Sequence, residues 1–524
     1  MNKGERFETD VLIIGCGIAG ASTALELAKQ GLNIIIVTRE KNPLESNTFH
    51  AQGGIVVLGE DDSPELLKKD IIDTGDWINN PQAVDILVTQ GKELVEKILM
   101  EELKVPFSRK EDGSLDYAQE ASHSRRRIIH VKDATGQSIE ERFISRLKEF
   151  KNVTFLTNHT AVDLLTIPHH SLSPIALYRE PQCIGAYILD NENERVNTVF
   201  ASYTILATGG LGRIFLHTSN PEGARGDGYA MAFRAGARIT NMEYIQFHPT
   251  SLFHRDAERF LISETLRGEG AQLKTKDGRL FMKKYSPNGD LAPRDEVTRA
   301  IYEEMIERGD SYVLLDLASY TKINIKERFP TIYQTCLNYG IDITKEPIPV
   351  VPAAHYCCGG VMVDEWGESS LKKLFAVGEV SCTGVHGANR LASTSLLEGL
   401  VWGTRAAKFI AENFDSTKPY QNSEIPDWRY PEKEEEEDPA LIHQDWFFIR
   451  STMWNYAGII RTQKRLDRAK ADLEYLEHRI EKFYKTTRMS DSLVGLRHGI
   501  QVALLVTYTA IKNQVSRGAH FRKD

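Results

Sequence analysis

Planar cations and imidazoles occur in separate motifs between residues 246 and 390. Arg294 lies in LAPRD and Arg390 in GVHGANR, whereas His248 lies in QFHPT and His355 in PAAHYCC. A guanidinium is a permanently charged fork that matches a carboxylate, and an imidazole adds a hydrogen-bond donor. Two such forks, held one small molecule apart, would bind both ends of a four-carbon dicarboxylate.

Two further motifs add polar groups to this set. SETLRGEG supplies the hydroxyl of Ser263 and the carboxylate of Glu264, and EASHSRRRIIHVKDATG begins with Glu120. The second stretch is equally compatible with a solvated basic surface and with a functional site. His248 alone would more often be a core residue, but its occurrence with two arginines and His355 favours a site.

The stretch DVLIIGCGIAG at residues 10–20 predicts the element that would place a cofactor beside these groups. Residues 11–14 predict a buried strand, residues 21–30 a helix and residues 33–37 a second strand. Between them, Gly15 allows a tight turn, Gly17 a close approach of backbone N–H groups to a pyrophosphate, and Gly20 close packing of helix on strand. The sequence therefore predicts a dinucleotide site.

The second strand is followed by Thr38, Arg39 and Glu40. Glu40 comes about two positions later than the acid that binds the ribose in nicotinamide enzymes. Residues 46–54, a polar loop that ends in two glycines, predict either a surface loop or the lining of a flat polar ring. The motif alone leaves NAD and FAD open.

Composition limits the possible functions. The 524 residues exceed one core and predict two to four domains. A net charge of −9 argues against nucleic acid as a main partner. We expect a cytoplasmic protein without a membrane partner, because no apolar run reaches the roughly 18–20 residues of a membrane span and the N-terminus lacks a signal-peptide pattern. Six cysteines without a CxxC pair predict neither zinc nor an iron–sulfur cluster, and so no metal.

The pattern of strands and glycine turns changes along the chain. It stops near residue 239 and returns near residue 352, which predicts an inserted domain. Residues 441–513 have helical periodicity and follow an acidic run at residues 432–438. We expect a helical C-terminal module in which Arg461, Lys464, Arg465 and Arg468 are surface charges.

Together the motifs resemble the FAD-containing succinate dehydrogenase and fumarate reductase flavoprotein family. GCGIAG, NTFHAQGG, EASHSRRRIIHVKDATG, ATGG, QFHPT, SETLRGEG, LAPRD, PAAHYCCGGV, FAVGEV and GVHGANRLASTSLLEG occur in the family's order. PAAHYCCGGV, residues 392–395 and Glu120 look most like the branch that oxidises L-aspartate. Membrane-bound succinate dehydrogenases attach FAD to a histidine where this chain has Asn47, so the resemblance implies noncovalent FAD.

The resemblance implies an α/β FAD-binding Rossmann-like domain (residues 1–238 and 353–419), an inserted α+β capping domain (239–352) and a C-terminal helical domain (420–524). It also implies a set of residues that contact the cofactor from pyrophosphate to flavin ring. This set is Gly15, Gly17, Ile18, Ala19, Gly20, Thr38, Arg39, Ser46, Asn47, Thr48, Gln52, Gly53, Gly54, Ala161, Val162, Ala207, Thr208, Gly209, Asp227, Glu379, Arg390, Ser395 and Leu396.

The implied reaction is hydride transfer from Cα of L-aspartate to flavin N5, with O2 or fumarate as the acceptor. The expected catalytic residues are Glu120, His248, Arg294 and His355, and the expected substrate-binding residues are His248, Ser263, Glu264, His355 and Arg390. The product, iminoaspartate, would pass to quinolinate synthase on the route to NAD. Two alternatives remain: a soluble fumarate reductase or succinate dehydrogenase flavoprotein subunit, and a flavin-binding protein that has lost catalysis.

Overall fold

The computed structural model describes residues 4–120, 122–132, 134–257, 260–321, 323–418, 420–431 and 434–524. Its N-terminus forms the predicted strand, turn and helix: β1 (Arg6–Ile14), α1 (Ile18–Lys29) and β2 (Ile34–Thr38), with β1 and β2 parallel. Gly15 has φ +107°, and a Cβ there would lie 2.2 Å from the carbonyl oxygen of Ala207. Glycine is therefore required at this turn.

The main sheet has the order β6-β2-β1-β9-β8-β7, and β16 also pairs with β9. Strands β6, β2, β1, β9 and β16 are parallel, whereas β7, β8 and β9 form an antiparallel meander. Strand β16 follows the insertion in the sequence, whereas the other strands of the sheet precede it. The sheet is therefore built from two separate stretches of chain. The bounds are β6 (Val153–Thr157), β7 (His159–Thr166), β8 (Cys183–Asp190), β9 (Arg195–Leu206) and β16 (Leu374–Ala376).

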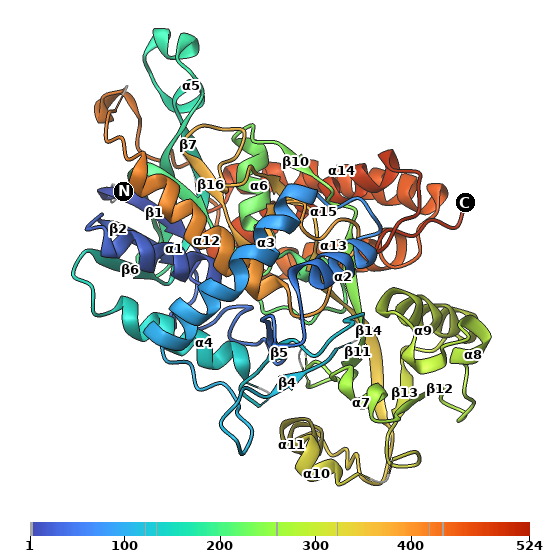
Figure 1. The fold of residues 1–524 in the computed structure, drawn as a ribbon. Coiled ribbons are helices and arrows are strands. Elements are labelled where there is room, and N and C mark those ends of the chain that lie inside the picture. The colour runs from blue at the N-terminus through green and yellow to red at the C-terminus, as the bar shows by residue number, and fades with distance from the viewer. Residues whose placement is uncertain are drawn as a thin grey trace.

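Helices and short strands surround this sheet. Helix α1 packs against α12 and α4, and a small sheet β3-β5-β4 lies beside them (Figure 1). The bounds are β3 (Ile55–Val56), α2 (Pro64–Thr74), α3 (Pro81–Leu94), a π-helix (Val95–Glu102), β4 (Tyr117–Ala118), β5 (Ile128–Ile129), α4 (Thr135–Leu147), α5 (Ile167–His170), α6 (Asp227–Arg234), β10 (Ile239–Thr240), β15 (Gly360–Met362), β17 (Ser381–Cys382) and α12 (Ser395–Glu412).

The insertion is built on an antiparallel sheet of order β11-β14-β13-β12 and appears in yellow-green to yellow in Figure 1. Strand β14 runs through positions 352 and 353, so the predicted domain boundary falls inside a strand and stays a prediction. The bounds are β11 (Ile245–Leu252), α7 (Thr265–Gly268), β12 (Gln272–Lys274), α8 (Met282–Tyr285), α9 (Arg294–Arg308), β13 (Val313–Asp316), α10 (Ile325–Arg328), α11 (Pro330–Asn338) and β14 (Ile348–Cys357).

Three long helices, α13 (Pro439–Tyr456), α14 (Gln463–Thr486) and α15 (Asp491–Lys512), form the C-terminal module. The side chains of Asp438, Thr462 and Ser490 cap their N-termini. By length and composition α15 could cross a membrane, but 72% of its apolar window is buried inside the protein. It is therefore a core helix. The predicted fold class is confirmed. Position 419, the predicted end of the FAD-binding domain, and residues 432–433 of the acidic run lie outside the described residues.

One prediction for this module is wrong, because Arg461 is not a surface charge. Its side chain is 0% exposed, and its Nη1 donates to the carbonyl oxygen of Glu243 at 2.7 Å and to Nδ1 of His520. The C-terminal tail covers this guanidinium. Helical periodicity could not predict this burial, because the residues that cover Arg461 belong to a distant part of the sequence.

Replacing Gly20 by alanine tests the packing of the cofactor turn. A Cβ at Gly20 would lie 2.2 Å from the carbonyl oxygen of Gly15. Because overpacking costs about 1–3 kcal/mol, we expect Gly20→Ala to lose about 10-fold in FAD affinity while it still folds. Flavin absorbance per protein and circular dichroism measure the two effects. Gly59→Ala is the control, since its Cβ would meet nothing closer than 3.7 Å; equal flavin content in both variants would contradict the packing argument.

Candidate active site

A single cavity of ≈ 1480 Å³ brings the predicted residues together from all along the chain. Every predicted site residue lines it except Gly20 and Val162. Gly20 instead packs on the β1–α1 turn. The side chain of Val162 is in the hydrophobic core, and its carbonyl oxygen accepts a hydrogen bond from Arg234 at 3.0 Å.

The end of the cavity at the β1–α1 turn fits a pyrophosphate. Helix α1 begins after Gly17 and its first turn contains no acidic residue, while the backbone N–H of Ile18 donates to Oγ1 of Thr48 at 3.0 Å. A Cβ at Gly17 would lie 3.1 Å from Oγ1 of Thr48. The helix thus directs its positive dipole end to the cavity, and this end of the cavity suits an anion.

Farther along, Glu379 faces the cavity from the segment after β16. Burial raises the pKa of its carboxyl from 4.5 to about 7. The backbone N–H of Cys357 donates to it at 3.0 Å, and Nδ2 of Asn47 lies 3.5 Å away. A buried carboxyl with spare acceptor capacity suits the hydroxyl groups of a sugar or ribityl chain.

The two histidines occupy neighbouring positions across the cavity wall. His248 on β11 and His355 on β14 have ring centroids 5.6 Å apart. Nδ1 of His248 lies 3.1 Å from the carbonyl oxygen of Thr250 and 3.2 Å from its backbone nitrogen, so this side of the ring is held by the backbone. Oγ of Ser219 lies 2.8 Å from Nδ1 of His355.

Both imidazoles are neutral. The pKa of His248 is lowered well below its usual value by burial, then by Arg294 and Arg267. Burial and the nearby Arg390 lower the pKa of His355 in the same way. Each ring can therefore donate a hydrogen bond to an anion without adding charge.

Arg390 is held from two sides. Its guanidinium carbon lies 4.7 Å from the centroid of the Tyr356 ring, and its Nη1 donates to Oγ of Ser395 at 3.1 Å. The Tyr356 hydroxyl donates to Glu398 at 2.9 Å. Tyr356 was not among the predicted site residues; its position next to His355 in PAAHYCC was the available signal.

Arg294, the first residue of α9, faces the same cavity beside Glu264 and Arg267. The Glu264 carboxylate contacts Arg294, and its Oε1 lies 3.2 Å from Nη2 of Arg267. Burial opposes the charge of Glu264, but these two guanidiniums outweigh it and lower the pKa of the carboxyl. Arg267 was also missed, although it lies in SETLRGEG.

Glu120 brings a second carboxylate to this region. Oγ of Ser393 donates to its Oε2 at 2.9 Å, and Glu120 interacts electrostatically with Arg294. We call the group formed by Arg267, Arg294, Arg390, Glu120 and Glu264 the polar end of the cavity; it has three guanidiniums and two carboxylates. With neutral histidines this leaves an excess of one positive charge.

Comparisons with known proteins agree with this architecture. Residues 10–396 match the FAD binding domain model, and residues 448–524 match the model for the fumarate reductase flavoprotein C-terminus. An L-aspartate oxidase of Acinetobacter baylyi is 42% identical over 98% of this chain and 93% of its own length. One of Pseudomonas aeruginosa is 41% identical over 99% and 96%. The chain belongs to the L-aspartate oxidase family.

Among solved structures, a variant of E. coli quinol fumarate reductase aligns with a TM-score of 0.87 at 28% identity, covering 99% of this chain and 92% of that one. The L-aspartate oxidase family thus shares its fold with fumarate reductases. The predicted resemblance is confirmed, and so is FAD as the cofactor. The N-terminus of α1, whose first turn has no acidic residue, and the glycine cradle fit its pyrophosphate.

The raised pKa of Glu379 predicts a pH-dependent stability. As pH rises from 4.5 to about 7, the unfolded chain loses this proton while the folded chain keeps it, so stability falls. A glutamine at this position would not titrate. We therefore expect the free energy of unfolding of Glu379→Gln, relative to the parent, to increase by about 2–3 kcal/mol between about pH 5 and pH 8.

Urea unfolding of the flavin-stripped full chain at both pH values measures this difference. Glu412→Gln, at a side chain that is 60% exposed, is the control and should show none of it. A pH-independent difference for Glu379→Gln would show that the carboxyl is ionised in the fold.

Proposed function

We propose that this chain oxidises L-aspartate to iminoaspartate with FAD, and that O2 or fumarate accepts the electrons. Its curated relatives at 41–42% identity are L-aspartate oxidases. The observation that carries the proposal is the position of Glu120, a carboxylate in a cavity otherwise built to hold anions. A dicarboxylate without an amine would gain nothing from it.

The charge of the polar end matches this substrate. L-aspartate has two carboxylates and one ammonium, a net charge of one negative, which balances the excess of one positive charge. Succinate and fumarate have two negative charges and would also face repulsion from Glu120. The site thus favours the amino acid.

The chain's own residues bind and orient the substrate. Arg390 and His355 would hold one carboxylate, and Arg294 and His248 the other, with Ser263 in reach as a hydroxyl donor. When bound, FAD supplies the hydride acceptor for the Cα–H of L-aspartate. Holding Cα in one orientation converts the reaction into an effectively unimolecular step.

Glu120 would bind the substrate ammonium and help it lose a proton. Burial opposes the charge of Arg294, but Glu264 and Glu120 outweigh it and raise the pKa of the guanidinium. Arg294 therefore stays protonated and acts through carboxylate binding and charge stabilisation rather than as a base.

A soluble fumarate reductase is the second candidate, because the fold is shared with quinol fumarate reductase. Its lower sequence identity of 28% and the presence of Glu120 favour aspartate oxidation. We further propose a cytoplasmic location and use of the product by quinolinate synthase for NAD synthesis. Iminoaspartate is unstable in water, so a consuming enzyme has to follow closely.

Glu120→Gln tests the proposal. The change removes the charge but keeps the shape, and a hydrogen bond to a charged group contributes about 1.5–3 kcal/mol. We expect the second-order rate of flavin bleaching by L-aspartate, measured anaerobically by stopped flow, to fall about 10- to 100-fold.

Fumarate reduction by the same variant is the internal control and should be unchanged or faster, because an anion near the diacid has been removed. Equal losses with both substrates would place Glu120 outside the amine site. Rapid bleaching of the parent by succinate but not by L-aspartate would overturn the function.

Asn47 predicts how the flavin is held. An amide side chain is not a nucleophile for attachment, so acid precipitation should release all FAD into the supernatant. Absorbance of the two fractions measures this. Flavin that stays with the precipitate would identify a covalent link and contradict the prediction, made from Asn47, that FAD is bound noncovalently.

A further inference from the structure

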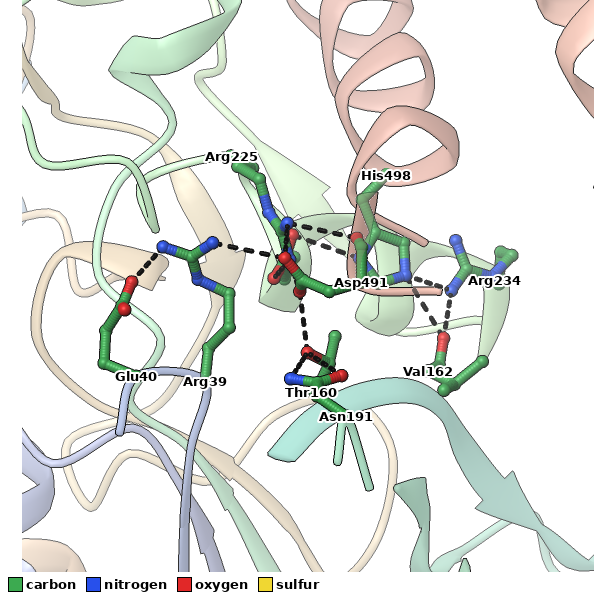
Figure 2. A network of polar contacts seen from close by, with 10 residues as sticks. Arg39, Glu40, Thr160, Val162, Asn191, Arg225, Arg234, Asp491 and His498 are labelled. Atoms are coloured by element: carbon green, nitrogen blue, oxygen red, sulfur yellow. Dashed lines mark hydrogen bonds and ion pairs between the residues drawn. The ribbon is translucent and has the colours of Figure 1, made fainter. Parts of the chain in front are cut away.

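Asp491, the first residue of α15, lies beside Arg39 and Thr160 (Figure 2). Oγ1 of Thr160 donates to its Oδ1 at 2.7 Å, and Nη1 of Arg39 lies 3.3 Å from its Oδ2. Thr160 and Arg39 both line the cavity. The C-terminal module therefore contacts two residues of the N-terminal sheet that face the cofactor.

Arg225 makes Asp491 the centre of a network. Its Nη1 donates to Oδ2 of Asp491 at 3.0 Å, and its Nη2 donates to Oδ1 at 2.9 Å. A Cβ at Gly495 would lie 2.4 Å from Nη1 of Arg225, so α15 has a glycine where the guanidinium passes. Figure 2 shows Asp491 between Arg39, Arg225 and Thr160.

A second contact joins α15 to the same wall. Nη2 of Arg234 donates to Nε2 of His498 at 3.0 Å, so the proton of this imidazole is on Nδ1. That nitrogen lies 3.1 Å from Oδ1 of Asp227, the first residue of α6 and a residue of the cavity wall. The helix is thus fixed at two points, one turn or more apart.

The network lies at the adenosine end of the cavity. In a dinucleotide-binding unit the pyrophosphate lies at the first glycine turn, and the end of the second strand faces the adenosine ribose. Arg39 directly follows β2, and Thr160 is on β7, next to Ala161 in the cavity wall.

We propose that Asp491 is a positioning residue for FAD, which holds Arg39 and Thr160 in place at the adenosine end of the cofactor. The inference rests on FAD as the cofactor and goes beyond the proposed reaction. Without the carboxylate, the guanidiniums of Arg39 and Arg225 would lose their shared anion, and Arg39 would be left to the neighbouring Glu40. Asp491 therefore acts on cofactor binding and not on the reacting carbon.

Asp491→Asn tests this role in the full-length chain after flavin removal. Losing one charged hydrogen-bond acceptor should weaken binding of FAD and of ADP about 10-fold, because both ligands contain the adenosine diphosphate. Binding of FMN, which lacks the adenosine, should not change. Flavin fluorescence titration measures FAD and FMN, and calorimetry measures ADP.

Two further variants distinguish positioning from general stability. Asp467→Asn, at an exposed carboxylate on α14, should bind all three ligands like the parent. Thr160→Val replaces the hydroxyl that contacts Asp491 and Asn191 by a methyl group of similar size. It should show the same selective loss of FAD and ADP, even if Asp491→Asn folds poorly. Equal weakening of FMN and FAD, or no weakening of ADP in either variant, would overturn the proposal. Such a result would not bear on the proposed reaction, which the Glu120→Gln variant tests separately.

Discussion

The guanidiniums of Arg267, Arg294 and Arg390 come together in the wall of one cavity, and burying a charge without a partner is costly. Glu264 between Arg294 and Arg267, the ring of Tyr356 beside Arg390, and Glu398 beyond that ring offset this cost. Neutral imidazoles add donors without further charge. The fold around the cavity supplies these partners from distant segments, and the residual positive charge is what an anionic substrate completes.

The strand pair β11–β14 brings much of this balance together. His248 pairs with Ala353 in the register of the two strands, so His248 and His355 come to the same wall. Tyr356 follows on β14 and contacts Arg390 from the later segment. Strand β14 thus carries both His355 and the aromatic ring that contacts Arg390.

The sequence was sufficient for features that depend on local chemistry. The strand–glycine–helix turn, the helical C-terminal module and the polar groups of the cavity follow from periodicity and from motifs of specific composition. Features that depend on long-range partners were missed. Arg461 looks like a surface charge until the tail covers it, and Asp491 is one acid among many on charged helices. Tyr356 and Arg267 lay inside recognised motifs, but only the packing shows that they contact the cavity residues.

The contact between Asp491 and the end of β2 joins the first part of the chain to one of the last parts to be synthesised. Domains begin to fold on the ribosome from the N-terminus. The nascent sheet can form its glycine turn early, but its adenosine side stays open until α15 has left the ribosome and docked. From the proposed role of Asp491, tight flavin loading belongs to the finished polypeptide, and a truncated translation product would retain the motif yet bind the coenzyme more weakly.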